Sequence, residues 1–271
     1  MPAINTNVAA LFAQQSLKVN ERNQSSAMRQ LSTGSRINTA GDDAAGMAIG
    51  QSMTTQVRGL NQAVRNLNDG VNMLQTAEGA LSETSNMLQR MRELAVQASN
   101  GTYSASQRGY LDTEFQALAA QITKVSTQTK WNDQSLLTTA TNFVFQAGKD
   151  NLQTITATIN DMGAVGLGLT TVLSLGTVAA SASSITALDT AIGTVNAQRA
   201  SIGAGINQMT YAVDNLSNVS SNASASRSSI MDTDYATAST QLSKTQIIQQ
   251  AATAMLAQAN QQPQAVLSLL K

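Results

Sequence analysis

The sequence predicts a mainly α-helical protein, an elongated rod of long antiparallel coiled-coil helices with a small β-hairpin region and paired terminal helices. Three observations predict this fold. Apolar residues recur every seven positions over long stretches, one short stretch alternates polar with apolar residues, and both ends of the chain lack charge. The 271 residues are enough for one large domain or two modest ones.

The clearest helical pattern begins near Ala44 and ends near Asn100, where Gly101 favours a helix stop because glycine readily adopts a left-handed conformation. Leucines occupy one seam position and valines the alternate one, which is typical of a coiled coil. The leucines are Leu60, Leu67, Leu74, Leu81 and Leu88. A helix of about 55 residues would be roughly 80 Å long, more than the ~50 Å diameter of a compact globule, so we expect an elongated molecule.

Two later segments keep the helical period and complete the predicted bundle. A capping box at Ser104 and Gln107 precedes the first, whose apolar residues step by three and four. The second is a long heptad segment interrupted by Arg199, much as Glu78 and Arg92 interrupt the valine seam of the first long helix. Its seam residues are Leu188, Val195, Ile202, Met209 and Leu216. We interpret the two sets of seam residues as the core of the rod.

A small β region lies between these helical segments. Residues 143–145 precede the turn-forming stretch 148–151, and residues 154–159 alternate polar with apolar, so we expect a hairpin. The uncharged stretch 162–188 allows two interpretations, a membrane span or a loop with short strands. Its glycines and threonines favour the loop.

Residues 1–17 and 245–270 carry no charge, and the positive segment of a cleavable secretion signal is therefore missing. Short isolated helices are marginal in water, and a water-facing helix normally carries charge. We therefore expect the ends to become ordered when copies of the chain stack on one another; the alternative is a closed pair of helices within one chain. The predicted interface residues are Ile4, Val8, Leu11, Ile248, Met255, Leu267 and Leu270.

The composition argues against an enzyme or a nucleic-acid-binding protein. Sixteen basic residues balance sixteen acidic ones, and the chain has neither histidine nor cysteine. It therefore lacks a basic footprint for nucleic acid, the commonest general base and the commonest zinc ligands. We predict no catalytic residue, no cofactor and no metal.

Two pairs of acidic residues could indicate a metal site or a catalytic acid/base pair, but structural roles explain both better. Asp42 and Asp43 could suggest a metal, yet a helix N-cap near residues 39–43 accounts for both. Asp232 and Asp234 diverge on a helix and make no acid/base pair.

Several motifs resemble those of the bacterial flagellins, in the family's order and over nearly the whole chain. The start of the chain, Ile4-Asn5-Thr6-Asn7, is similar to the flagellin N-terminus. So are residues 31–38, LSTGSRIN, and 42–49, DDAAGMAI. Residues 89–101, QRMRELAVQASNG, are similar to the family's long-helix end, and residues 255–267, from MLAQANQ onward, to its C-terminal signature.

The resemblance implies a structural subunit of the flagellar filament, which self-assembles into a hollow helical polymer for swimming motility. Residues 1–41 and 233–271 would be the terminal-helix domain lining the inner tube. Residues 42–232 would be the helical rod domain, with hairpins at about 138–180 and no outer domains. The family has Arg where Met231 stands and commonly Glu where Ala238 stands; these departures concern polar subunit contacts and not the fold.

The resemblance also implies partners and a location. The partners are other copies of the chain, the flagellar type III export apparatus, a flagellin chaperone, the filament cap and the hook-junction proteins, with no nucleic acid and no membrane insertion. The protein would be secreted and extracellular, in the bacterial flagellum. The family's contact with a flagellin-sensing Toll-like receptor maps onto Arg90, Leu94, Gln97 and Glu114.

Three other functions compete with the filament subunit. One is a hook–filament junction protein, which would share similar ends; the C-terminal signature favours the filament. Another is a secreted type III translocator that inserts residues 162–188 into a membrane. The third, a flagellin with a zinc-protease insert, requires histidines that the chain lacks.

Overall fold

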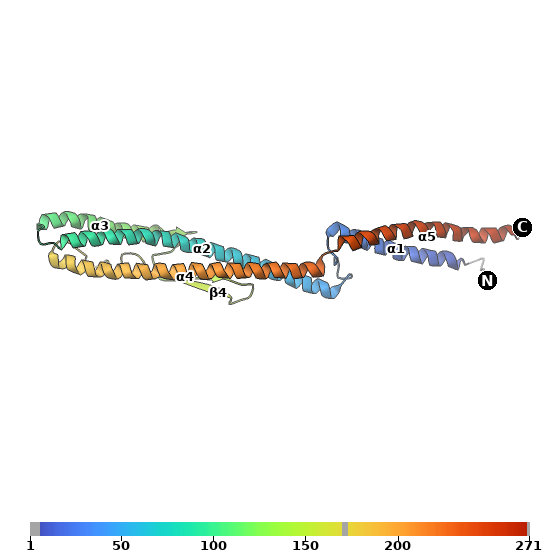
Figure 1. Cartoon of the computed structure of the whole chain (residues 1–271), viewed down its shortest axis with the longest axis horizontal. Helices are drawn as coiled ribbons and strands as arrows, with labels where there is room; N and C mark the ends of the chain where they lie inside the picture. Colours follow the sequence, from blue (N-terminus) through green and yellow to red (C-terminus); the bar gives the residue numbers. More distant parts are fainter. Residues whose placement is uncertain (1–5, 170–172, 270–271) are drawn as a thin grey trace. The chain divides into compact units, whose positions relative to one another are not determined.

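The computed structural model describes the backbone of residues 6–169 and 173–269, and side chains as far as residue 261. The predicted mainly α-helical fold with a small β-hairpin region is confirmed (Figure 1). In chain order the elements are α1 (Val8–Thr33), α2 (Ala44–Ala98), α3 (Ala105–Gln128), β1 (Lys130–Trp131), β2 (Gln134–Ser135), β3 (Thr141–Gln146), β4 (Thr154–Ile159), α4 (Val178–Met231) and α5 (Tyr235–Leu269). The chain divides into two compact units, residues 58–220 and residues 1–57 with 221–271.

The unit of residues 58–220 has a continuous apolar core in which α2, α3 and α4 pack side by side (Figure 1). The heptad positions of both long helices lie inside it. Buried among them are Leu60, Leu67, Leu74, Leu81, Leu88, Leu188, Val195, Ile202 and Met209, and Leu216 is partly buried. A second stripe of α2, which includes Met91 and Leu94, joins the same cluster as Phe115 of α3. One helix therefore packs against two neighbours, as two apolar stripes require.

The charged residues that interrupt the two seams meet across α2 and α4. Arg199 lies 2.7 Å from Glu78, and Arg92 lies 2.6 Å from Asp189. From the first pair to the second, the residue number rises along α2, from 78 to 92, and falls along α4, from 199 to 189. The two helices are therefore antiparallel. Both are partly exposed, so each adds little to stability and mainly discriminates against other pairings.

Two glycines of α2 allow the β3–β4 hairpin to lie against this helix. A Cβ on Gly59 would come within 3.0 Å of Lys149, and one on Gly70 within 2.9 Å of Phe145. The hairpin is antiparallel, with Thr141 opposite Ile159 and Gln146 opposite Thr154. Glycine is needed at these two positions because Lys149 and the Phe145 ring leave no room for a Cβ.

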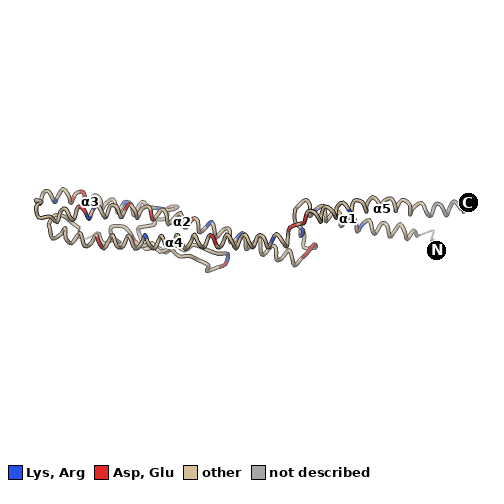
Figure 2. The backbone as a smooth tube through the Cα atoms, in the orientation of Figure 1, with Lys and Arg blue, Asp and Glu red and all other residues tan. Residues whose placement is uncertain are grey.

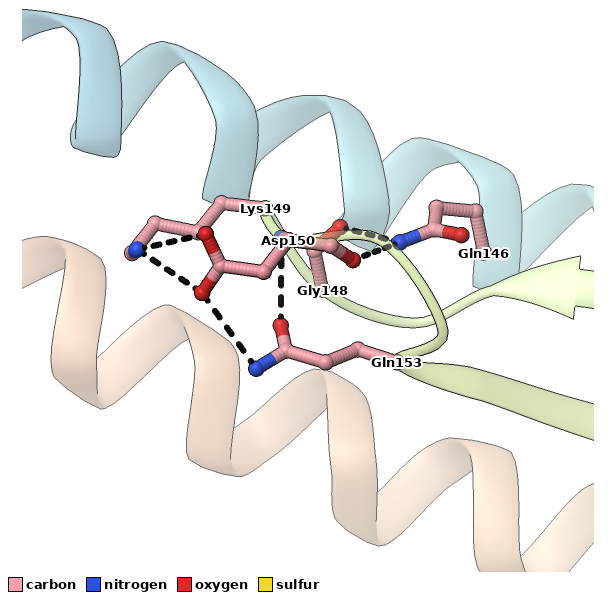
Figure 3. A network of polar contacts seen from close by, with 5 residues as sticks. All are labelled: Gln146, Gly148, Lys149, Asp150 and Gln153. Carbon is pink, nitrogen blue, oxygen red and sulfur yellow. Dashed lines mark hydrogen bonds and ion pairs between the residues drawn. The ribbon is translucent and has the colours of Figure 1, made fainter.

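The hairpin turn holds itself together through side chains (Figure 3). The amide of Gln146 donates to the carbonyl oxygens of Gly148, at 2.9 Å, and Asp150, at 2.6 Å. The Lys149 ammonium lies 2.8 Å from the Asp150 carboxylate, and the backbone N–H of Asp150 donates to Gln153. These bonds satisfy turn backbone groups that the β ladder leaves free.

The structure differs from the sequence expectation over residues 162–188. We expected a loop with short strands, but residues 162–169 form turns and α4 already begins at Val178. The chain reverses here by burying Met162, Leu167 and Leu175 in the core. Within the described residues α4 is the one helix whose length and composition would allow a membrane crossing.

A substitution in the leucine seam tests this core. Leu81→Ala removes a completely buried side chain and should lower the free energy of unfolding by about 2–5 kcal/mol, because a cavity remains. Urea denaturation followed by circular dichroism measures the change. Leu152→Ala, at an 84% exposed position of the hairpin turn, is the control and should have almost no effect. Equal effects of the two substitutions would contradict the predicted core.

Candidate assembly surface

The terminal helices α1 and α5 pair with each other within the unit of residues 1–57 and 221–271 (Figure 1). The Asn7 side chain caps the start of α1 by accepting from the N–H of Ala10 at 3.1 Å. The helix ends at Gly34, which adopts a left-handed φ of 70°. Asp234 caps the start of α5 by accepting from the N–H of Ala236 at 2.9 Å. Both helices therefore begin at a polar capping side chain.

The line of contact between the two helices, which we call the inner seam, consists mostly of small and polar residues. They recur every three or four positions and are buried or partly buried. The seam comprises Ala10, Ala13, Leu17, Asn20, Gln24 and Ala27 of α1, and Ala238, Leu242, Thr245, Gln249, Ala252, Leu256 and Ala259 of α5. The most deeply buried members are Asn20, Ala27, Ala238 and Thr245, each at most 5% exposed. Little apolar area is removed from water along such a seam.

Apart from Leu17, Leu242 and Leu256, which belong to the seam, large apolar side chains of the same helices are exposed to water. They form what we call the outer apolar face, and their exposed fractions range from 41 to 69%. Its members are Val8, Leu11, Phe12, Val19, Met28, Ile247, Ile248 and Met255. Charge is sparse beside them: α1 carries Lys18, Glu21, Arg22 and Arg29, and α5 carries only Lys244 (Figure 2).

Four of the seven predicted interface residues lie on this outer apolar face: Val8, Leu11, Ile248 and Met255. Ile4 and Leu270 lie outside the described residues, as does the side chain of Leu267. The sequence reasoning missed Phe12, Val19, Met28 and Ile247. The spacing of Val8, Phe12 and Val19, by four and seven residues, is a helical stripe that would have identified two of them.

The two segments that lead into the terminal helices pair with each other. Ser35 and Asp232 form an antiparallel bridge, and the N–H of Thr233 donates to the carbonyl of Gly34 at 2.9 Å. Arg36 caps the end of α4: its N–H donates to Met231 at 2.7 Å, and its guanidinium to Ile230 at 2.6 Å. We call these contacts the linker bridge. They occupy carbonyl groups that the end of α4 would otherwise leave unsatisfied.

The predicted N-cap before α2 is confirmed. Asp43 accepts from the N–H of Gly46 at 2.8 Å, and Asp42 accepts from the N–H groups of Asn38 and Thr39. These hydrogen bonds hold the pKa of Asp42 below its ordinary value, and the bond from the N–H of Thr39 has the largest effect. Among the described residues no three acidic side chains gather closely enough to bind a metal ion.

The four residues of the candidate receptor contact do not all reach the surface. Arg90 bridges Glu114 and Glu93, each at 3.0 Å, and its side chain is half exposed. Gln97 is exposed and donates to the hydroxyl of Tyr103. Leu94 is only 1% exposed. It supports this surface from beneath and offers no area to a partner.

Comparison with known proteins gives consistent matches. The model of the bacterial flagellin N-terminal helical region matches residues 4–142, and that of the C-terminal helical region matches residues 185–270. Flagellin of Halalkalibacterium halodurans is 43% identical over 272 residues, and flagellin of Bacillus subtilis is 41% identical over 302 residues; 99% of each chain is covered in both cases.

Solved structures agree with the fold. The crystal structure of Bacillus cereus flagellin is 34% identical, with a TM-score of 0.51 over 56% of this chain and 88% of that one. A candidate flagellar hook-associated protein from Vibrio parahaemolyticus has a TM-score of 0.60 over 70% of this chain and all of that one. At 13% identity the second match shows only a shared fold.

Acid should weaken the α5 cap. The hydroxyl of Thr237 and then the N–H groups of Ala236 and Thr237 lower the pKa of Asp234 below 3.8. A lowered folded-state pKa contributes stability above the unfolded-state value, and this stability is lost as pH falls through the folded value. We expect the stability difference between the parent and Asp234→Asn to disappear between about pH 5 and about pH 2.

Denaturation followed by circular dichroism at several pH values measures this difference. Asp214→Asn removes a charge from an exposed position within α4 and controls for net charge alone. A parent-to-Asp234→Asn difference that stays constant down to the lowest pH would contradict the role of the carboxylate.

Proposed function

The chain belongs to the bacterial flagellin family, and we propose that its terminal helices α1 and α5 are the surface through which copies assemble. Members of this family are structural subunits of the flagellar filament, and so is this chain; it is not an enzyme. The filament is an extracellular structure that serves motility. The proposal concerns which residues make the polymer and how.

One observation carries the proposal: ten of the thirteen residues in the inner seam of the α1–α5 pair are small or polar, while eight large apolar residues lie on its outer apolar face. A stable soluble monomer would have the opposite arrangement. An exposed apolar surface of this kind marks an interaction site. The other copies of the chain are the partner that would cover it, since a nearly uncharged surface offers little repulsion to its own kind.

The thin inner seam supports a coupling between ordering and assembly. Alanine, glutamine and threonine remove little apolar area from water, so the isolated pair gains little against the entropy of ordering two helices. Neighbouring copies add the missing burial when they cover Phe12, Ile247 and Met255. The ends of the chain would then become rigid mainly within the polymer.

We assign the proposed layers as the family resemblance implies. Residues 1–41 and 233–271 would line the inner tube, and residues 42–232 would form the next shell. Contacts divide the chain elsewhere, inside α2 after Val57 and inside α4 after Ser220. The boundary between the two proposed layers would instead fall at the linker bridge, where the backbone of Ser35 pairs with that of Asp232.

The remaining partners follow from family membership. We propose export through the flagellar type III apparatus with a flagellin chaperone, followed by assembly beneath the filament cap on the hook-junction proteins. For the Toll-like receptor we propose a contact through Arg90, Gln97 and Glu114, because these side chains are exposed on α2 and α3. Leu94 would act only as the apolar support beneath them.

A truncation tests the role of α5. Deleting residues 245–271 removes most of this helix and should leave a soluble helical monomer that does not polymerise, because α5 loses all three of its residues on the outer apolar face. Electron microscopy under polymerising conditions measures the outcome, with the full chain forming hollow filaments as the control. Normal filaments from the truncated chain would overturn the proposed role of the terminal helices.

A single substitution tests the outer apolar face more sharply. Phe12 is 69% exposed and touches water in the single chain, so Phe12→Glu should leave the monomer's helix content unchanged. Burial of a phenylalanine contributes about 1.5–3 kcal/mol, and each 1.4 kcal/mol is tenfold in affinity, so the critical concentration should rise at least about tenfold.

Sedimentation of polymer at a series of protein concentrations measures the critical concentration. Phe12→Leu keeps the position apolar and is the matched control, with a change of less than about threefold. If Phe12→Glu polymerises like the parent, Phe12 does not lie at a contact between copies.

A further inference from the structure

Three hydrogen bonds join the N-terminal and C-terminal segments of the terminal unit, and together they define the register of α1 against α5. The Asn7 amide donates to the carbonyl of Ala259 at 2.8 Å. The Asn20 amide donates to the carbonyl of Thr245 at 2.7 Å. Asn20 lies thirteen residues after Asn7 on α1, and Thr245 lies fourteen residues before Ala259 on α5. At the linker bridge Gly34 accepts from Thr233. The helices are therefore antiparallel, with an alignment that stays constant to within one or two residues from end to end.

The inner seam by itself does not specify this register. Alanines and glutamines recur along both helices, so a shift of seven residues would set similar small residues against each other. The linker bridge is also a weak constraint, because Arg36 and Asp232 are exposed and their backbone groups can exchange partners with water. A residue inside the seam has to discriminate between registers.

Asn20 has the required properties. It is 5% exposed, and its amide reaches across the seam to a carbonyl at Thr245, which is 2% exposed. A helical carbonyl oxygen has a second lone pair available beside its intrahelical bond. In a shifted register the Asn20 amide would be buried without that partner, and an unsatisfied buried amide is costly.

We propose that Asn20 is the residue that selects the register of the α1–α5 pair. Asn7 supports it near the far end, where the seam is only partly buried. A buried asparagine is known to fix the register of coiled coils at some cost in stability. In this chain Asn20 would fix the register of a seam whose apolar packing is too weak to favour one register over another.

The consequence for the polymer rests on the proposed function. A shift of seven residues moves one helix by about 10 Å along the other. The native register sets Ile247 and Met255 of α5 within one residue of the levels of Val19 and Leu11 of α1, and after the shift they would no longer align. Copies with different registers would present different outer apolar faces and would not fit one lattice.

Paired cysteines can read the register directly, because the chain has none of its own. Ala27 lies seven residues after Asn20, and Ala238 lies seven residues before Thr245, so the native register sets them opposite each other. Ala27→Cys with Ala238→Cys reports this register. Ala27→Cys with Thr245→Cys reports a shift of seven residues, and the latter change leaves the Thr245 carbonyl in place.

The experiment compares disulfide yields of the two cysteine pairs in the full chain, with and without Asn20→Leu. We expect the native pair to form at least about tenfold more disulfide than the shifted pair in the parent, because the amide bond discriminates by roughly that factor. With Asn20→Leu the two yields should come within about twofold, at unchanged helix content. Gln24→Leu makes a partly buried position of the seam more apolar while keeping the Asn20 amide bond, and should leave the parent ratio intact.

Outcomes separate the two proposals. If Asn20→Leu keeps the parent ratio, or if Gln24→Leu abolishes it, Asn20 does not select the register. If Asn20→Leu unfolds the chain, Asn20→Gln, which keeps an amide, decides instead: recovery of a native-to-shifted ratio above about fivefold supports the proposal, and its failure overturns it. If the cysteine-free parent forms no filaments, the proposed function fails, whatever the disulfide ratio shows.

Discussion

The structure depends on one constraint: the terminal helices leave most of their large apolar residues exposed within a single chain. The inner seam holds alanine, glutamine, asparagine and threonine with three leucines, while Phe12, Ile247 and Met255 face water. Such a pair is an incomplete core that other copies complete. Every functional conclusion follows from this arrangement, because a chain that satisfied its own apolar surface would have no reason to polymerise.

The unit of residues 58–220 has the opposite character. Its two long helices and α3 bury continuous stripes, with residues such as Leu81, Phe115 and Val195 fully enclosed. Ion pairs between Glu78 and Arg199, and between Arg92 and Asp189, replace apolar contacts where the seams are interrupted. This unit therefore has an apolar core of its own, which the terminal helices lack, although Tyr110, Val165 and Tyr211 on its surface are more than 70% exposed.

The helices and the hairpin could be predicted from sequence because their signals are local and repeated. Heptads placed the long helices, and the capping box at Ser104 placed the start of α3. The described residues of 162–188 form none of the expected strands, because uncharged Thr and Ser residues suit a buried helix start as well as a loop. The partners of Arg199 and Arg36 depend on contacts about 120 to 194 residues apart, which no local pattern encodes.

Polarity in the seam also explains why a single sequence pattern fits both a monomer and a polymer. Large residues in the seam would stabilise the pair within one chain but would also let it slide between equivalent registers. Asn20 lowers the stability of the pair and raises its specificity, since its amide has one buried partner. The weakness of the pair and its precise alignment are then two results of the same choice of residues. A subunit that must travel as a monomer and fit one lattice as a polymer requires both.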